Sequence, residues 1–178
     1  SMSKLVASIT GSSTSGSPLT PGTQITGVNV LGELNNQVYY AIEQNSKYYL
    51  ANGSGELFYS KAIEKAKAVI GYVTAGHGIV LVKDASSAKA IDFNGKEIAD
   101  GTDISVSKFG FIGVEYNDTA SNGTTQKHTK IISYEGTTLL SGRTGELAHY
   151  VASTVNEDNT ASDYLKNGSH VFTIVDPY

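Results

Sequence analysis

The sequence of 178 residues contains no cysteine and no tryptophan, and Met2 is its only methionine. The absence of cysteine excludes disulfides, iron–sulfur clusters and thiolate zinc sites, and it is compatible with either a cytosolic or an exported location. Arg143 is the only arginine, although arginine is the side chain best suited to bidentate recognition of phosphates and bases. Together with a net charge of −4, this scarcity argues against a nucleic-acid partner.

Long apolar runs are also absent. No run approaches the ~18 residues of a transmembrane helix, so we expect no membrane insertion. The opening residues, SMSKLVASITGSS, lack the long apolar core of a signal peptide. The protein is therefore either not exported or the mature part of an exported protein, and its composition favours the second interpretation.

The first part of the chain is poor in residues that can build a core. Residues 8–24 consist mainly of Ser, Thr, Gly and Pro, which cannot bury enough apolar area to offset the entropy lost on ordering. We predict a flexible leader over residues 1–24 and a β-rich domain over residues 25–178. The pattern leaves open whether this domain consists of two subdomains, 25–85 and 86–178.

Strand signals dominate from Ile25 onward. Alternating apolar and polar residues, rich in aromatic and β-branched side chains, are typical of strands. Residues 37–42 and 47–51 are predicted to form a hairpin with a four-residue turn, and residues 90–101 a second hairpin with Asn94-Gly95 at its tip. The nearly continuous apolar run 77–84 predicts a strand buried on both faces. Further strands are expected at 25–34, 103–116, 129–136, 137–142 and 170–178. The strand 103–116 is expected to contain a bulge or bend at Gly110 and Gly113.

One segment departs from this alternation. In residues 56–70, apolar side chains recur at helical spacing among alanine, lysine and glutamate, which predicts an inserted helix. One or two short helices are expected near 145–167. Because runs of strands lack regular helical crossovers, the predicted fold class is mainly β, with antiparallel sheets in a sandwich-like arrangement.

No motif of an active site is present. The four histidines, His77, His128, His149 and His170, show no metal-ligand spacing, and no nucleophile elbow GxSxG occurs. The oxygen-rich loop 156–163 lacks the spacing of a calcium-binding loop, so a solvated acidic loop is favoured. We therefore predict no catalytic residue, no metal, no cofactor and no enzymatic activity.

Asparagine-rich turns and tyrosines are the remaining candidates. Asn-Gly pairs at 52, 94, 122 and 167 are typical of hairpin tips or, at 167, of a helix C-cap. Asn-x-Ser/Thr triplets begin at residues 52, 117, 122 and 167, and chance occurrence is favoured over glycosylation. Eleven tyrosines suit either an interface or the surface of a sheet. The candidate interface residues are Tyr39, Tyr40, Tyr48, Tyr49 and Arg143.

Several features together resemble a known family. The leader rich in Ser, Thr and Gly, the missing Cys and Trp, the lysine bias and stretches such as FNGKEI (93–98) and NSKYYLANG (45–53) are similar to surface-layer and surface-layer-associated proteins of lactobacilli. The resemblance implies a secreted, β-rich structural protein that assembles into a lattice on the cell wall. The acidic balance and the missing lysine- and tyrosine-rich wall-binding modules depart from that pattern, which implies an assembly-side fragment.

Three functions follow as hypotheses. The first is a structural or assembly domain of a Gram-positive cell-surface layer, located at the cell wall, whose partner is a second copy of itself, with a cell-wall polymer or a host glycan as further candidates. The second is an adhesin or phage receptor-binding module that recognises a glycan or protein. The third is an accessory domain of a secreted hydrolase.

Overall fold

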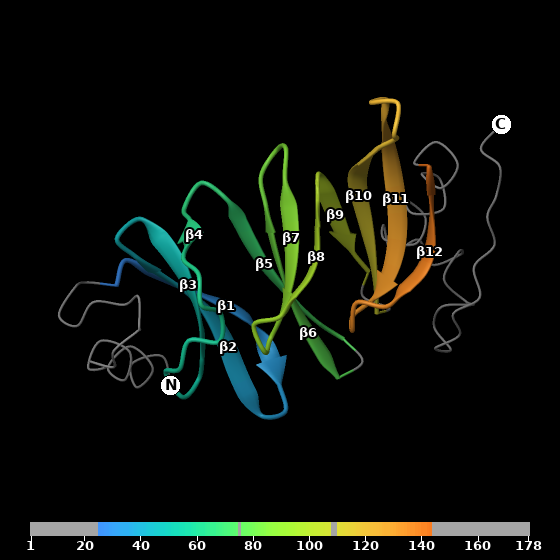
Figure 1. The fold of residues 1–178 in the computed structure, drawn as a ribbon. Helices are drawn as coiled ribbons and strands as arrows, with labels where there is room; N and C mark the ends of the chain where they lie inside the picture. The colour runs from blue at the N-terminus through green and yellow to red at the C-terminus, as the bar shows by residue number, and fades with distance from the viewer. Residues whose placement is uncertain (1–24, 75, 108–109, 144–178) are drawn as a thin grey trace. The chain divides into compact units, whose positions relative to one another are not determined.

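A computed structural model describes residues 25–74, 76–107 and 110–143, which form strands and turns and contain no helix. The strands build three four-stranded antiparallel sheets, in the orders β1-β2-β3-β4, β5-β6-β7-β8 and β12-β11-β10-β9 (Figure 1). The strands are β1 (Gly27–Leu34), β2 (Gln37–Gln44), β3 (Lys47–Asn52), β4 (Ile63–Glu64), β5 (Ala68–Thr74), β6 (His77–Lys83), β7 (Ala88–Asp92), β8 (Glu97–Gly101), β9 (Asp103–Val106), β10 (Phe111–Thr119), β11 (Thr125–Ser133) and β12 (Thr138–Arg143).

The described chain divides into two units. The first contains residues 25–82 and 91–96, and the second contains residues 83–90 and 97–143. The division between subdomains considered from the sequence, near residue 85, stays a prediction. The leader 1–24, the short helices near 145–167 and the strand 170–178 lie outside the described residues.

Two-residue turns connect the first three strands. Asn35 and Asn36, and then Asn45 and Ser46, have φ values between 53° and 64°. Positive φ at both central residues is the requirement of a type I′ turn, whose twist matches that of the flanking strands. The hairpin of β2 and β3 therefore has a turn of two residues, and the four-residue turn predicted for it is wrong, because Glu43 and Gln44 continue the ladder opposite Tyr48 and Lys47.

A second kind of turn recurs along the chain. In each copy the first residue donates its N–H to the carbonyl four residues on, and a glycine at the fourth position, with φ between 82° and 97°, donates back to the first carbonyl. This is the pattern of a type I turn followed by a glycine bulge. Within the described residues, copies of this turn lie at 52–55, 92–95, 107–110, 120–123 and 133–136.

The predicted helix over residues 56–70 is wrong. The segment forms an irregular stretch, the short strand β4, a turn and the start of β5. Its apolar side chains serve two different clusters: Leu57 and Ala62 pack with one, and Phe58, Tyr59 and Ile63 with the other. A single apolar stripe of a helix cannot reach both faces of a sheet, so burial outweighs helix propensity.

The first unit has a core on each face of the sheet β1-β2-β3-β4. Alternation along a strand sends successive side chains to opposite faces, so Ala41 and Leu50 enter one cluster while Ile42 and Tyr49 enter the other. The first cluster is completed by Leu31, Tyr59, Ile63, Val80, Val82, Ile91 and Phe93, and the second by Tyr40 and Ala51.

The second unit is built on the sheet β12-β11-β10-β9. The strand predicted for residues 103–116 is divided into β9 and β10 by the turn from Ser107 to Gly110, which ends at one of the two glycines where a bulge or bend is expected. The buried hydroxyl of Tyr134 donates to the carbonyl oxygen of Ser107 over 2.7 Å and holds this turn. Gly110, with φ of +97°, supplies the left-handed position that the turn requires.

Other predictions from the pattern are confirmed. The strand β6 is buried at its five central residues, as the run 77–84 predicts, and β7 and β8 form the hairpin expected around Asn94-Gly95. The tip of that hairpin is anchored, since Phe93 is buried and stacks on Tyr39 at 4.3 Å between ring centroids. The part of the chain that the structure describes contains no apolar helix long enough to span a membrane.

Candidate functional site

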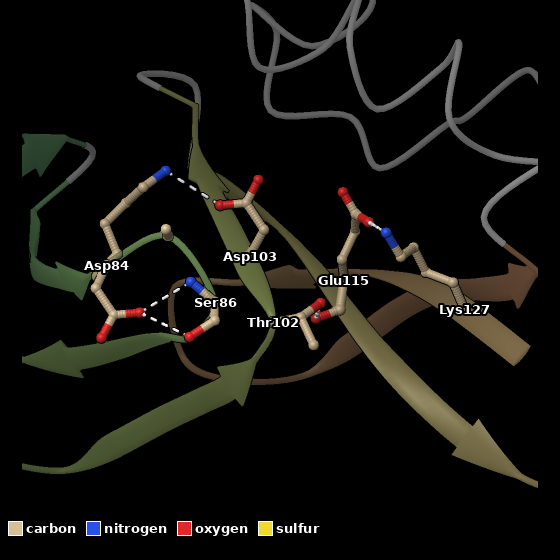
Figure 2. Close-up of a pocket in the computed structure, with 8 residues that line it drawn as sticks. Asp84, Ser86, Thr102, Asp103, Glu115 and Lys127 are labelled. Carbon is tan, nitrogen blue, oxygen red and sulfur yellow. Dashed lines mark hydrogen bonds and ion pairs between the residues drawn. The ribbon is translucent and has the colours of Figure 1, made fainter. Parts of the chain in front are cut away.

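A polar groove in the second unit brings together four segments that are distant in the sequence (Figure 2). Its volume is about 390 Å³. The lining residues are Lys83, Asp84, Ala85, Ser86, Thr102, Asp103, Glu115 and Lys127. They come from the end of β6 and its following loop, from the corner between β8 and β9, and from β10 and β11.

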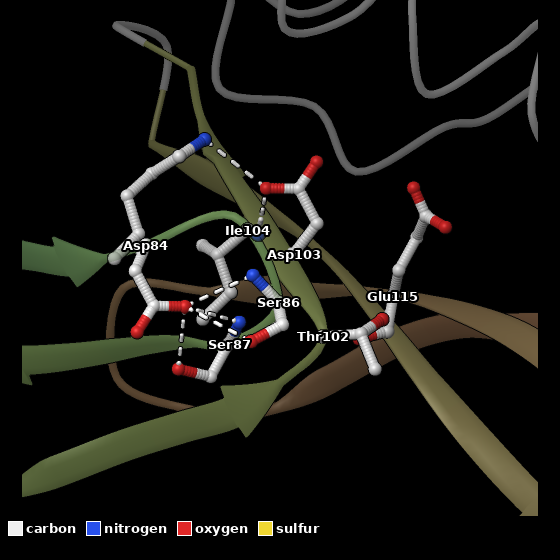
Figure 3. A network of polar contacts seen from close by, with 8 residues as sticks. Asp84, Ser86, Ser87, Thr102, Asp103, Ile104 and Glu115 are labelled. Atoms are coloured by element: carbon white, nitrogen blue, oxygen red, sulfur yellow. Dashed lines mark hydrogen bonds and ion pairs between the residues drawn. The ribbon is translucent and has the colours of Figure 1, made fainter.

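The loop after β6 forms one wall and is held by a single carboxylate oxygen. Asp84 Oδ1 accepts from the backbone N–H groups of Ser86 and Ser87, both at 2.9 Å, and from their hydroxyls at 3.3 and 3.1 Å (Figure 3). The N–H of Asp84 in turn donates to the carbonyl of Ser87. An aspartate that satisfies nearby backbone donors fixes a turn, so this wall is rigid before any ligand arrives.

The corner between β8 and β9 is fixed against β10. Thr102 donates its N–H at 2.8 Å and its hydroxyl at 3.2 Å to the carbonyl oxygen of Glu115. At Gly101 a Cβ would overlap that same oxygen. Only glycine allows such a close approach of two backbones, so the sequence Gly-Thr holds the backbone of β10 at Glu115 beside the groove.

The floor carries two carboxylates directly opposite each other. Asp103 of β9 is the register partner of Glu115 of β10, and like charges in that relation destabilise a sheet. Each carboxylate has its own lysine: Lys83 Nζ lies 3.1 Å from Asp103 Oδ1, and Lys127 Nζ lies 3.4 Å from Glu115 Oε1. Asp103 Oδ1 also accepts the N–H of Ile104 at 2.9 Å.

This arrangement places hydrogen-bond acceptors and donors side by side. Three carboxylates and two lysines give the lining a formal charge of −1, and the hydroxyls of Ser86 and Thr102 stand among them. All four partners of the two ion pairs keep 32–57 % of their side-chain surface exposed. Such pairs contribute little to stability, so the polar groups remain available to a ligand with both hydrogen-bond donors and acceptors.

An exposed apolar edge is the second notable surface, and it belongs to the first unit. Val30 on β1 is 60 % exposed, and Ile70 and Val73 on β5 are 42 % and 39 % exposed. They are the exposed large hydrophobic side chains among the described residues. β1 lies at the edge of its sheet, and its sequence GVNVLGEL contains neither lysine nor proline, the residues that commonly protect an edge strand from pairing.

Glycines let β5 lie against part of that edge strand. A Cβ at Gly71 would overlap the carbonyl group of Leu31, and one at Gly32 would meet the side chain of Val73. The centre of β1 is therefore covered by β5, whereas Asn29 and Val30 remain exposed. Val30, Ile70 and Val73 lie around the place where β5 approaches β1, and together they define the exposed apolar edge.

An ion pair of the first unit shows the clearest electrostatic shift. Lys65 Nζ lies 2.8 Å from Glu43 Oε1. The hydrogen bond from Lys65, with its charge, lowers the pKa of Glu43, and the same bond raises the pKa of Lys65. Lys65 is exposed and Glu43 is half buried. The two groups form a structural pair, so these shifts indicate a local contribution to stability.

The four tyrosines predicted at an interface lie in the hairpin of β2 and β3. Tyr40 and Tyr49 are buried, with 8 % and 5 % exposure, in the cluster on one face. Tyr39 and Tyr48 are half buried against the cluster on the other face. The structure thus places all four in core packing, and their part in an interface stays a prediction.

Arg143 ends β12, where it is the register partner of His128. The side chain of Arg143 lies outside the described structure. His128 packs against the ring of Tyr116 and lies 3.7 Å from Asp118. His77 is half buried in β6, and the histidines at 149 and 170 and the acidic loop 156–163 lie outside the described residues.

The asparagines of the candidate triplets serve turns and strands. Asn52 Oδ1 accepts the N–H groups of Ser54 and Glu56, and Asn122 Oδ1 accepts that of Thr124. Asn117 is exposed on β10. The fourth triplet, at 167, lies outside the described residues.

No pattern in the sequence indicates the groove. Asp103 and Glu115 become neighbours only through strand register, and Lys83 and Lys127 come from segments 20 and 12 residues away from their partners. The one local signal was Asp84-Ala85-Ser86-Ser87, a typical turn sequence. Among the described residues, no group of three or more histidine, aspartate or glutamate side chains could hold a metal ion.

Comparison with known proteins gives no assignment. No protein-family model matches the sequence, and a search of curated proteins finds no significant match.

Proposed function

We propose that the chain is a structural domain of a secreted bacterial cell-surface protein of the surface-layer type, which acts through self-association. In this proposal it resides at the cell wall, its partner is a second copy of the same chain, and antiparallel sheets in a sandwich-like arrangement form its architecture. The proposal rests on composition, on the β-rich fold and on one surface observation, the exposed apolar edge.

The exposed apolar edge supports self-association for a physical reason. An edge strand presents unpaired backbone N–H and C=O groups, and exposed β-branched side chains favour pairing with another strand. Val30, 60 % exposed on β1, combines both properties. Burying apolar surface there on association contributes about 25 cal/mol per Å².

Sedimentation velocity over a range of protein concentrations tests the proposal. We expect the weight-average mass to rise with concentration and to persist in about 0.5 M salt, because apolar contacts are not screened. Val30→Lys places a charge on the edge and is expected to shift association to higher concentration by tenfold or more, since lysine protects edges.

A matched control uses the same new residue at an exposed turn of the other unit. Thr124→Lys, in the turn between β10 and β11, is expected to associate like the unmodified chain. A chain that stays strictly monomeric at millimolar concentration would overturn the proposal. Equal effects of the two lysine variants would remove the exposed apolar edge as its basis.

A further inference from the structure

We propose that the polar groove of the second unit binds a neutral saccharide. This inference goes beyond the proposed assembly role and does not depend on it, because the exposed apolar edge belongs to the first unit and the groove to the second. The groove residues that contact the sugar hydroxyls are Asp103, Glu115, Lys83, Lys127 and the hydroxyl-bearing Ser86 and Thr102.

The first reason is an energetic conflict at the floor. Asp103 and Glu115 stand opposite each other in the β9–β10 ladder, although like charges in this position are unfavourable. In the same unit, by contrast, Lys89 and Glu97 form a pair of opposite charges at 3.3 Å. Local conflicts of this kind concentrate at sites with a function.

The second reason is the balance of donors and acceptors. Each floor carboxylate already has a lysine within 3.4 Å, so the lining as a whole carries a formal charge of only −1. A groove for a phosphate would need unpaired cations. A sugar ring presents several hydroxyls, each both donor and acceptor, and it matches a lining in which carboxylates alternate with ammonium and hydroxyl groups.

The third reason is rigidity and size. The wall at Asp84–Ser87 is fixed by four hydrogen bonds to Asp84 Oδ1, and the wall at Thr102 by two bonds to the Glu115 carbonyl. Polar groups that are fixed in advance lose little entropy on binding. A volume of about 390 Å³ lies at the lower end of the range for small-molecule sites, which fits one or two sugar rings.

The test is a titration of the ¹⁵N-labelled chain with maltose and with N,N′-diacetylchitobiose, each up to about 20 mM, so that millimolar dissociation constants are detected. We expect at least one sugar to shift the amides of Ser86, Ser87, Thr102 and Asp103 together. The shifts should persist in about 0.5 M sodium chloride, because the ligand is neutral.

Two variants separate binding from folding. Asp103→Asn removes one of the opposed charges, so we expect the affinity for the sugar to fall at least tenfold while the stability of the unit stays equal or rises. Lys89→Gln removes a charged pair outside the groove lining, and its affinity should equal that of the unmodified chain.

Three outcomes would overturn the inference. The first is the absence of groove shifts with either sugar. The second is a response to calcium chloride or to methylammonium, but not to the sugars, which would identify a cation site. The third is sugar-induced shifts at amides outside the groove that Asp103→Asn leaves unchanged. None of these outcomes affects the concentration-dependent association that tests the assembly role.

Discussion

Replacing Gly95 with alanine is expected to destabilise the first unit far more than the same replacement at Gly76. Both glycines belong to that unit and both have positive φ, +85° and +76°. They differ in surroundings: a Cβ at Gly95 would overlap the backbone carbonyl of Phe58, whereas nothing lies within 4 Å of a Cβ at Gly76.

The magnitudes follow from this difference. A left-handed conformation costs an alanine about 1–2 kcal/mol, and the restricted unfolded chain returns about 0.4–1 kcal/mol. Gly76→Ala should therefore lose about 1 kcal/mol. At Gly95 the new methyl group must also displace backbone, and overpacking of this kind costs about 1–3 kcal/mol. Gly95→Ala should lose about 2–4 kcal/mol in total.

Urea unfolding measures both variants. Because the chain has two units, a single global signal would mix two transitions. Two-dimensional NMR spectra recorded along the urea series allow the buried amides of Leu50 and Ile91 to report on the first unit. Losses for Gly95→Ala and Gly76→Ala that agree within about 0.5 kcal/mol, the usual size of surface effects, would refute the close packing of the β7–β8 turn against Phe58.

Two further predictions concern a charge and a buried hydroxyl. The hydrogen bond with Lys65 lowers the pKa of Glu43. The pair therefore stabilises the fold at pH values above 4.5, the ordinary pKa of glutamate, and this contribution is lost as the pH falls through the lowered pKa. Glu43→Gln should weaken the pH dependence of the free energy of unfolding in this pH range. Urea midpoints measured between pH 3 and 7 test this, and a pH dependence equal to that of the unmodified chain would contradict the pairing. Tyr134→Phe removes the donor to the buried carbonyl of Ser107 and should cost about 1–3 kcal/mol; a loss under about 0.5 kcal/mol in urea unfolding would show that the bond is unimportant.

Predictions that depend on neighbours in the sequence were confirmed most often. The run 77–84 predicts a strand buried on both faces because continuous apolar residues leave no side for solvent, and β6 confirms it. The hairpin around Asn94-Gly95 is predictable because asparagine and glycine accept the backbone angles of a turn at little cost.

Errors arose where burial overrode local preference. Residues 56–70 have helical spacing, yet Leu57 and Phe58 enter clusters on opposite faces of the sheet, and no helix can supply both. The strand expected over 103–116 is divided at Ser107 by a turn, which Tyr134 holds from the turn that follows β11. In each case the deciding contact comes from a segment that pattern alone cannot locate.

By itself, the sequence determined the β-rich class and the places of most turns, because both follow from alternation and from the backbone angles that each residue allows. It also excluded disulfides and thiolate metal sites through the absence of cysteine. Only the tertiary structure decided which polar residues meet. Asp103 faces Glu115, and each finds its own lysine, because strand register joins residues that the chain separates, and no local pattern encodes that register.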